Sequence, residues 1–258
     1  MIYYPLTTLL LAGCDDILIV TAPEVMIDFE LFLGDGSKFG VSITYLAQPE
    51  PLGVSDALAI AETFVAKQSF FLILGDNLFF SSGLSELLSR MKEGGEGIAS
   101  VLTFRANDPE RFGVIEFDQY GNVTSIVEKP KIPPSDRVVT GLYFLPGDAP
   151  QIASELEPSS RGEVEITDLL NFYIASTADF RVFDLPRGAI WYDAGTIEAM
   201  YNASEFVRSY QLASGCLIGC PEEVAIGRGL VSAEHVLKNL ASSQSKSPYV
   251  QYIKSLSK

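Results

Sequence analysis

The most constraining feature of this sequence is an alternation of short apolar runs, rich in Ile, Val and Phe, with longer amphipathic segments. Short runs of β-branched and aromatic residues favour strands. The longer segments carry apolar residues at spacings of three and four, which is the helical period. A sheet covered by helices satisfies both patterns, so the sequence predicts an α/β fold.

The first part of the chain predicts strands and helices in regular alternation. Strands are expected at 17–21, 41–46, 70–74 and 98–104, and helices at 5–12, 24–33, 55–66 and 84–92. Taken in order, these elements predict successive βαβ units.

The middle of the chain changes character. Segments 113–117 and 123–127 flank a stretch in which Gly121 and Asn122 suit the positive φ of a hairpin turn. Further strands are expected at 139–144, near 180–184 and around Trp191, with a helix at 165–176. From residue 196 the pattern is helical, with helices at 197–212, 222–226, 233–240 and 249–256. We therefore divide the chain into an α/β core over 1–200 and a C-terminal helical region over 201–258.

The charge balance restricts the partners of this chain. Its 33 Asp and Glu residues against 18 Lys and Arg residues give a net charge of −15. This charge repels nucleic-acid phosphates and anionic lipids alike, so neither nucleic acid nor a membrane is expected as a partner. No apolar run approaches the ~18 residues that a membrane helix needs. A small anionic substrate must be held by individual basic groups, backbone N–H groups or a divalent cation.

The cysteines indicate a reducing compartment. Cys14, Cys216 and Cys220 cannot all be paired, and a chain of 258 residues needs no disulfide to fold. We therefore expect the chain to be cytoplasmic. His235 is the only histidine, so Cys216 and Cys220 lack the further ligands of a zinc site.

Two aspartates follow apolar runs that end just before a helix-forming segment. Asp76 lies in LGDN after the expected strand 70–74, and Asp193 lies in WYDAGT. Ligands bind at the carboxyl ends of parallel strands, and two such carboxylates could share one Mg²⁺. The same residues also suit helix starts, and local sequence does not decide between these interpretations.

Two further segments carry polar groups at strand ends. Lys129 follows the expected strand 123–127, and Pro130 fixes the direction in which the chain leaves. A lysine here suits a sugar phosphate, although Glu128 and Lys129 alone are more typical of a solvated ion pair. Gln48 and Gly53 offer an amide and a close backbone approach to a base, or form an ordinary loop.

A series of motifs runs through the chain in a fixed order: MIYYPL, LGDN, NDPERFGV, VEKP, TGLYF, RGEVEITD and WYDAGT. This order resembles the bacterial glucose-1-phosphate thymidylyltransferases. The resemblance extends over nearly the whole chain and includes CPEE in the C-terminal region.

The resemblance implies a Rossmann-like nucleotidyltransferase fold with a mixed sheet, an inserted hairpin region and a C-terminal helical group. It implies synthesis of dTDP-glucose and pyrophosphate from dTTP and glucose-1-phosphate with Mg²⁺, by a homo-oligomer that is a tetramer in the family. The catalytic residues implied are Asp76, Asp193 and Lys129, the two aspartates being the metal ligands. Gln48 and Gly53 would meet the thymine base. The sugar-phosphate pocket would be lined by Asn77, Gly113, Glu128, Lys129, Val139, Tyr143, Arg161 and Trp191.

The sequence also departs from this family. Phe112 stands where the family has Tyr, and Val54-Ser55-Asp56 replaces the usual residues after the base-binding glycine. Family members carry a strand and a Gly-Gly-x-Gly-Thr-Arg phosphate loop before the Tyr-Tyr-Pro found here at 3–5, and we expect a chain without them to be poorly stable and inactive. Two alternatives stay open: a UTP- or CTP-dependent relative, and an inactive remnant or regulatory subunit that keeps the sugar-phosphate half-site.

Overall fold

The computed structural model describes residues 1–93, 95, 97–176, 180–240 and 247–256. The strands are β1 Asp16–Thr21, β2 Ser42–Ala47, β3 Phe70–Ile73, β4 Asn77–Phe80, β5 Ser100–Arg105, β6 Gly113–Phe117, β7 Val123–Glu128, β8 Arg137–Leu145, β9 Arg181–Asp184 and β10 Ile190–Asp193. The helices are α1 Tyr3–Leu11, α2 Pro23–Leu33, α3 Val54–Ile60, α4 Glu62–Val65, α5 Leu84–Lys92, α6 Ala149–Ser154, α7 Ile166–Ser176, α8 Ile197–Ser214, α9 Pro221–Gly227, α10 Ala233–Leu240 and α11 Pro248–Ser255. Short 3-10 turns occur at Ser37–Phe39 and Pro109–Arg111.

Strand β8 is the centre of the largest sheet, whose order is β7-β6-β8-β5-β9 with β3 also paired to β8. β3 and β5 both run antiparallel to β8, and β9 runs parallel to β5. Every residue of β8 after Arg137 is buried. The sheet is therefore mixed, and its longest strand has no solvent-facing side.

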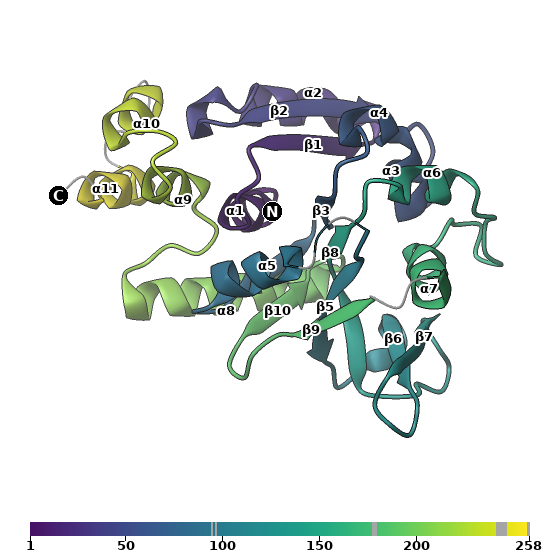
Figure 1. Ribbon diagram of the computed structural model, residues 1–258. Coiled ribbons are helices and arrows are strands. Elements are labelled where there is room, and N and C mark those ends of the chain that lie inside the picture. The colour runs from purple at the N-terminus through teal and green to yellow at the C-terminus, as the bar shows by residue number, and fades with distance from the viewer. Residues whose placement is uncertain (94, 96, 177–179, 241–246, 257–258) are drawn as a thin grey trace.

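Alternate residues of β8 enter two separate cores. Tyr143 and Leu145 pack with α3, α6 and α7, whereas Leu142 and Phe144 pack with α5. Figure 1 shows these helices on opposite sides of β8. Because successive strand side chains point to opposite faces, an apolar run without polar alternation is what such a strand requires.

The sheet corrects the expectation of successive βαβ units. The first unit is confirmed, since β1, α2 and β2 form a parallel pair with a connecting helix. β2 and β3 do not pair with each other, and β8 lies between β3 and β5. Hydrophobic periodicity locates strands but carries no information on which strands pair, so this part of the prediction was wrong.

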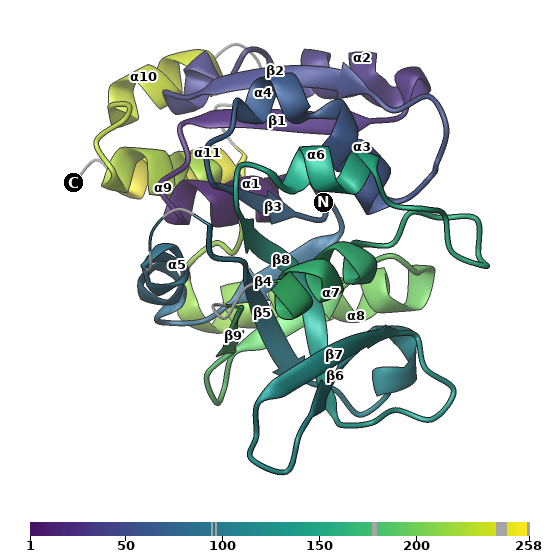
Figure 2. The same cartoon turned by 45° about the vertical axis from the view of Figure 1, so that its right-hand side comes forward.

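Two elements were missed. β4 pairs antiparallel with β10, opposing Asn77 to Asp193, and α6 follows β8. The expected helix 55–66 is divided into α3 and α4 at Ala61. The hairpin β6–β7 forms as expected and projects from one end of the molecule in Figure 2.

The C-terminal helices α8–α11 form as expected. α9 packs on α1, where the buried Glu222 carboxylate accepts hydrogen bonds from the hydroxyls of Tyr249 and Tyr3. The proposed domain boundary at residue 200 falls inside α8, so the division into two regions stays a prediction. No helix in the part of the chain that the structure describes is long and apolar enough to cross a lipid bilayer.

The turn before β3 and the turn after β8 pack closely against each other. Ala66 and Lys67 adopt the left-handed conformation, with φ of 48° and 64°. A Cβ on Gly147, in the turn after β8, would lie 2.1 Å from the carbonyl carbon and oxygen of Lys67. Only glycine therefore allows the end of β8 to approach the beginning of β3 this closely.

Replacing Gly147 by Ala is expected to destabilise the fold, because the added methyl group overlaps the Lys67 backbone. Overpacking typically lowers the free energy of unfolding by about 1–3 kcal/mol, which urea denaturation monitored by circular dichroism measures. Gly227→Ala is the control, since that position in α9 has space for a methyl group. Equal stability of the two variants would contradict the close packing of these turns.

Candidate active site

Asp76 and Asp193 meet at one edge of the β4–β10 pair. Asp76 lies between β3 and β4, and Asp193 is the last residue of β10. The Ala194 N–H donates to the Asp76 carbonyl over 3.0 Å. A carboxylate oxygen of Asp76 and one of Asp193 lie 3.0 and 3.3 Å from the point where a Cβ on Gly195 would stand. The two carboxylates thus face the same small space.

The electrostatics of this pair suit a cation. Burial and the neighbouring Asp76 raise the pKa of Asp193, while Arg111 and Lys129 act in the opposite direction. Among the described residues no group of three or more His, Cys, Asp or Glu side chains could hold a metal. Mg²⁺ is commonly bound by one or two carboxylates, with waters and substrate phosphates as further ligands, so this donor set fits it.

Asn77 connects the aspartate pair to the sheet. The residue is 1% exposed. Its Oδ1 accepts hydrogen bonds from the Gly141 N–H over 3.1 Å and from Trp191 Nε1 over 2.6 Å. Its Nδ2 donates to Asp76 Oδ1 over 2.8 Å. Residues of β4, β8 and β10 thereby share one amide group.

Aromatic side chains form the wall beside this amide. Trp191 is buried, with ring centroids 5.0 Å from Phe112 and 5.7 Å from Phe104. Tyr143 on β8 is also buried, and burial raises the pKa of its hydroxyl, with further contributions from Glu128, Asp193 and Asp76. All three carboxylates thus act electrostatically on the Tyr143 hydroxyl.

Lys129 has an unusual backbone conformation. Its φ is 42°, in the left-handed region that residues other than glycine rarely adopt. Its N–H donates to the Phe112 carbonyl over 3.0 Å, and its Nζ lies 3.8 Å from Glu128. Such conformations cluster at binding sites, because the surrounding structure must offset their cost.

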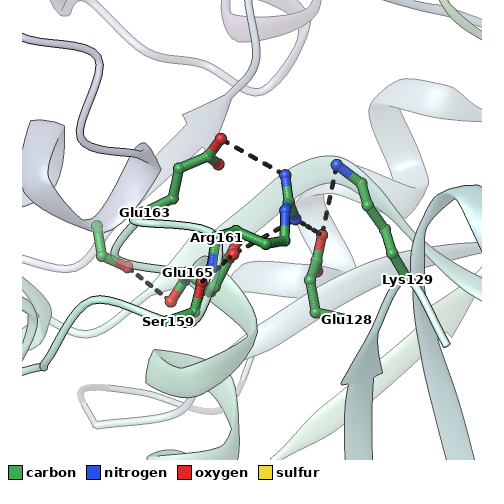
Figure 3. Close-up of polar contacts among 7 residues, drawn as sticks. Glu128, Lys129, Ser159, Arg161, Glu163 and Glu165 are labelled. Carbon is green, nitrogen blue, oxygen red and sulfur yellow. Dashed lines mark hydrogen bonds and ion pairs between the residues drawn. The ribbon is translucent and has the colours of Figure 1, made fainter.

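Arg161 lies among three glutamates, as Figure 3 shows. Its guanidinium nitrogens are 3.3 Å from Glu128 and Glu165 and 3.5 Å from Glu163. These distances exceed the 2.7–2.9 Å typical of a strong charge-assisted hydrogen bond. Ser159 Oγ donates to the mostly buried Glu165 over 2.8 Å. Arg161 is therefore held loosely, with 38% of its side chain exposed.

Burial and Glu165 raise the pKa of the Glu128 carboxyl, whereas Lys129 and Arg161 lower it.

The hairpin residue Gly113 lies opposite Glu128 in the β6–β7 register, and a Cβ on Gly113 would lie 2.9 Å from Thr167. The end of the hairpin thus packs directly on the start of α7. Val139 is buried in the core beside Tyr143.

Gln48 and Gly53 lie at the loop between β2 and α3. Gln48 Nε2 donates to the Gly53 carbonyl over 3.0 Å and to Asp56 Oδ2 over 2.7 Å. Gly53 has a φ of 104°, and a Cβ there would lie 2.6 Å from the Val164 carbonyl oxygen. The glycine is thus required by close packing against the segment that carries Arg161.

Comparison with known proteins decides the family. The nucleotidyl transferase family model matches residues 1–210. A glucose-1-phosphate thymidylyltransferase from Xanthomonas campestris pv. campestris is 44% identical over 258 residues, covering 100% of this chain and 86% of that protein. The chain belongs to the nucleotidyl transferase family. This confirms the resemblance inferred from the sequence motifs.

Solved structures confirm the fold. A Bacillus anthracis protein assigned as a glucose-1-phosphate thymidylyltransferase, crystallised with sucrose, has a TM-score of 0.71 and 36% identity, covering 80% of this chain and 82% of its own. A UDP-glucose pyrophosphorylase complexed with UDP-glucose has a TM-score of 0.67 at 24% identity, covering 81% and 86% of the two chains, which shows the shared fold alone.

This nucleotidyl transferase brings the expected residues into two connected groups. Asp76, Asn77, Trp191 and Asp193 form one, and Gly113, Glu128, Lys129 and Arg161 form the other. Carboxylates of both groups raise the pKa of the Tyr143 hydroxyl, which links the two groups electrostatically. Gln48 and Gly53 join the second group through Val164. The roles of these residues toward substrates stay predictions.

Sequence reasoning did not single out Arg111, Glu163 or Glu165. Arg111 stacks on Phe112, with 5.2 Å from Cζ to the ring centroid, and acts on Asp193. Glu163 and Glu165 alternate with Val164 in the RGEVE motif. This alternation could have indicated that Glu163 and Glu165 act together, because a period of two places both carboxylates on one side of an extended segment.

Replacing Gly195 by Ala is expected to weaken metal binding in this nucleotidyl transferase. The methyl group would lie 3.0 Å from an Asp76 oxygen and 3.3 Å from an Asp193 oxygen, so both carboxylates must shift to accommodate it. Disturbing the orientation of metal ligands typically costs roughly tenfold or more in affinity. The Mg²⁺ concentration for half-maximal turnover measures the effect.

Gly75→Ala is the matched control, because its methyl group has no neighbour within 4 Å although it precedes Asp76. An unchanged Mg²⁺ requirement in Gly195→Ala would show that the two carboxylates do not share an ion.

Proposed function

We propose that this chain transfers a thymidylyl group from dTTP to glucose-1-phosphate, giving dTDP-glucose and pyrophosphate. The observation that carries this proposal is the facing pair of Asp76 and Asp193, with Lys129 close enough to act on Asp193 and Arg161 paired with the neighbouring Glu128. In a molecule of net charge −15, such a site is suited to a metal-bound polyphosphate beside a second phosphate. The relatives' names support the same reaction.

The reaction needs positioning and charge neutralisation more than covalent chemistry. A phosphate oxygen of glucose-1-phosphate attacks the α-phosphorus of dTTP, and the bond to the β-phosphate oxygen breaks as pyrophosphate leaves. Lys129 and Arg161 bind the phosphate of glucose-1-phosphate and hold the attacking oxygen in place. Arg161 can exchange its long contacts with Glu128, Glu163 and Glu165 for a phosphate at little cost.

Asp76 and Asp193 would hold Mg²⁺, which neutralises charge on the transferred phosphate when bound. Val139, Tyr143 and Trp191 are buried, and such side chains would limit water at the sugar end of the site. Glu128, at the end of β7 beside Lys129 and Arg161, is suited to accepting a hydrogen bond from a sugar hydroxyl.

Gln48 is suited to selecting the base. Both N–H groups of its amide are directed at Gly53 and Asp56, so its Oε1 is the group left for a base. An acceptor fits the N3–H of thymine or uracil, whereas cytosine carries an unprotonated N3. The amide thus favours dTTP or UTP over CTP.

We further propose that the enzyme works in the cytoplasm as a homo-oligomer, a tetramer as in the family. The free thiols of Cys14, Cys216 and Cys220 support a reducing compartment. Exposed apolar side chains on α8, including Ile197 and Leu212, support a subunit interface. Light scattering coupled to size-exclusion chromatography measures the oligomeric state.

The direct test uses purified protein that also carries the Gly-Gly-x-Gly-Thr-Arg phosphate loop of the family, because a chain without that loop is expected to be inactive. It is supplied with Mg²⁺, glucose-1-phosphate and dTTP, UTP or CTP in turn. Pyrophosphate release and chromatography of the nucleotide sugar are recorded. We expect dTDP-glucose as the main product and its loss on chelation of Mg²⁺. Exclusive use of another nucleotide, or the absence of turnover, would overturn the proposal.

Lys129→Ala is expected to weaken glucose-1-phosphate binding, because it removes a charged donor to the phosphate. The loss should be roughly 1.5–3 kcal/mol, the range for a hydrogen bond to a charged group, and isothermal titration calorimetry measures it. Lys131→Ala provides the control, since it removes an equal charge from an exposed position two residues away. Unchanged affinity in Lys129→Ala would mean that Lys129 and Glu128 are only a solvated ion pair.

Asp56→Ala is expected to relax base selection, because the freed Gln48 amide can then rotate and present its N–H group. The ratio of kcat/KM for dTTP to that for CTP should fall about fivefold, which corresponds to about 1 kcal/mol, the value of one hydrogen bond. Glu50→Ala removes an exposed carboxylate of the same loop and should leave the ratio unchanged. A ratio unaffected by Asp56→Ala would remove Gln48 from the base site.

A further inference from the structure

Ser55 joins the loop between β2 and α3 to the segment that precedes α7. Its N–H donates to the Val164 carbonyl over 3.3 Å, and the Val164 N–H donates to the Leu52 carbonyl over 2.7 Å. Its hydroxyl donates to the Glu165 carbonyl over 3.0 Å. These bonds fasten the two segments to each other at the first turn of α3.

Both polar groups of Ser55 depend on this junction. Backbone N–H groups in the first turn of a helix have no partner within the helix. The N-cap residue Gly53 has no side chain to supply one, and the Val164 carbonyl accepts instead. Ser55 is also completely buried, at 0% exposure. A buried hydroxyl needs a hydrogen-bond partner, which here is the Glu165 carbonyl.

Glu165 connects this junction to Arg161. Its carbonyl oxygen also accepts from the Asp168 N–H over 3.3 Å, in the first turn of α7. Its carboxylate accepts from Ser159 Oγ over 2.8 Å and lies 3.3 Å from the Arg161 guanidinium. Ser55 therefore fixes the backbone of the residue whose side chain holds Arg161.

We propose that Ser55 is a positioning residue that couples binding of the nucleotide base to binding of the sugar phosphate. A base bound at Gln48 and Gly53 holds the loop in one place. Ser55 then fixes Glu165, and Glu165 keeps Arg161 where it meets the phosphate. This inference rests on the proposed function, since it takes the loop as the base site and Arg161 as a phosphate ligand.

The coupling acts in both directions. When one ligand orders a shared segment, the second ligand binds without that entropic cost. Each ligand then raises the affinity for the other by the same factor. Ser55 lies in the stretch Val54-Ser55-Asp56, where this chain departs from the family pattern. Its hydroxyl bond is therefore a feature of this chain.

The test measures the coupling as a ratio of two dissociation constants, in protein that carries the phosphate loop. Glucose-1-phosphate is titrated by isothermal calorimetry with Mg²⁺, alone and with a saturating dTTP analogue. A methylene bridge between the α- and β-phosphorus of the analogue prevents transfer. In wild-type protein we expect the analogue to lower the dissociation constant about fivefold or more, the lower end of typical coupling between sites.

Ser55→Ala should reduce this coupling factor about fivefold, the factor that corresponds to one ordinary hydrogen bond. The dissociation constant measured without the analogue should change less than about twofold, because a single lost bond between loops leaves Arg161 in place. The Glu165 carbonyl keeps Asp168 as a partner, so the variant leaves no buried acceptor without a donor.

Ser100→Ala is the matched control. Ser100 is also 0% exposed, and its hydroxyl donates to the Met91 carbonyl over 3.3 Å. The same group is thereby lost from a bond between β5 and the end of α5, away from the base loop. This variant should keep the wild-type coupling factor.

Each outcome is decisive. A coupling factor of one in wild-type protein would overturn the proposal, and so would an unchanged factor in Ser55→Ala. Equal weakening of glucose-1-phosphate binding with and without the analogue would mean that Ser55 is merely structural, which also overturns it. Wild-type protein that makes no dTDP-glucose would instead fault the proposed function and remove the inference with it.

Ser55→Cys keeps the inference testable if Ser55→Ala does not fold, as thermal unfolding monitored by circular dichroism will show. The thiol fills the buried position but is a weak donor, so the bond to Glu165 weakens. We expect the coupling factor to fall in this variant as well. A wild-type factor in folded Ser55→Cys protein would overturn the proposal.

Discussion

Strand β8 is buried on both faces. This burial fixes the register of the strand and therefore the positions of the site residues that it carries. Its pairing with β3 opposes Leu142 to Ile73, which brings the chain to Asp76 just beyond the sheet. A shift of one residue would exchange the two cores and move every β8 side chain to the opposite face. Neither core could accept that exchange, since each is packed on its own helices. The register of β8 is therefore set by burial, and Gly141 and Tyr143 reach the site as its consequence.

A few basic side chains supply the positive charge near the site of this acidic molecule. The chain is strongly acidic, yet Arg111, Lys129 and Arg161 gather near carboxylates of the site. The contacts of Lys129 and Arg161 with these carboxylates are long, so both cations can exchange them for a phosphate, whereas Arg111 is held by Asp108 at 2.7 Å. The positive φ of Lys129 indicates that its placement is imposed by the β7 end and Pro130 and not by its own preference.

The sequence allowed most elements of the fold to be predicted, because apolar runs and amphipathic periods are local. Strand pairing was not predictable, and neither was β4, since Asn77–Phe80 is too short to show a period. The places of the two aspartates after apolar runs made them candidates, but the metal role was implied by the family resemblance, and their shared space depends on the β4–β10 register. Asn77 shows the limit most clearly. The resemblance implied a place in the sugar-phosphate pocket, which stays a prediction, whereas its hydrogen bonds to Gly141 and Trp191 could not be foreseen because they depend on how the strands pair.

Trp191 is the only tryptophan in the chain, and it lies two residues before Asp193 with its indole bonded to Asn77. Intrinsic fluorescence excited at the red edge of protein absorption therefore reports on this one location. An ion, a sugar phosphate or a loosened Asn77 would each change the polarity or quenching around a single emitter. The fold thus carries its own optical probe, and stopped-flow mixing can follow the order in which ligands reach the site without any label.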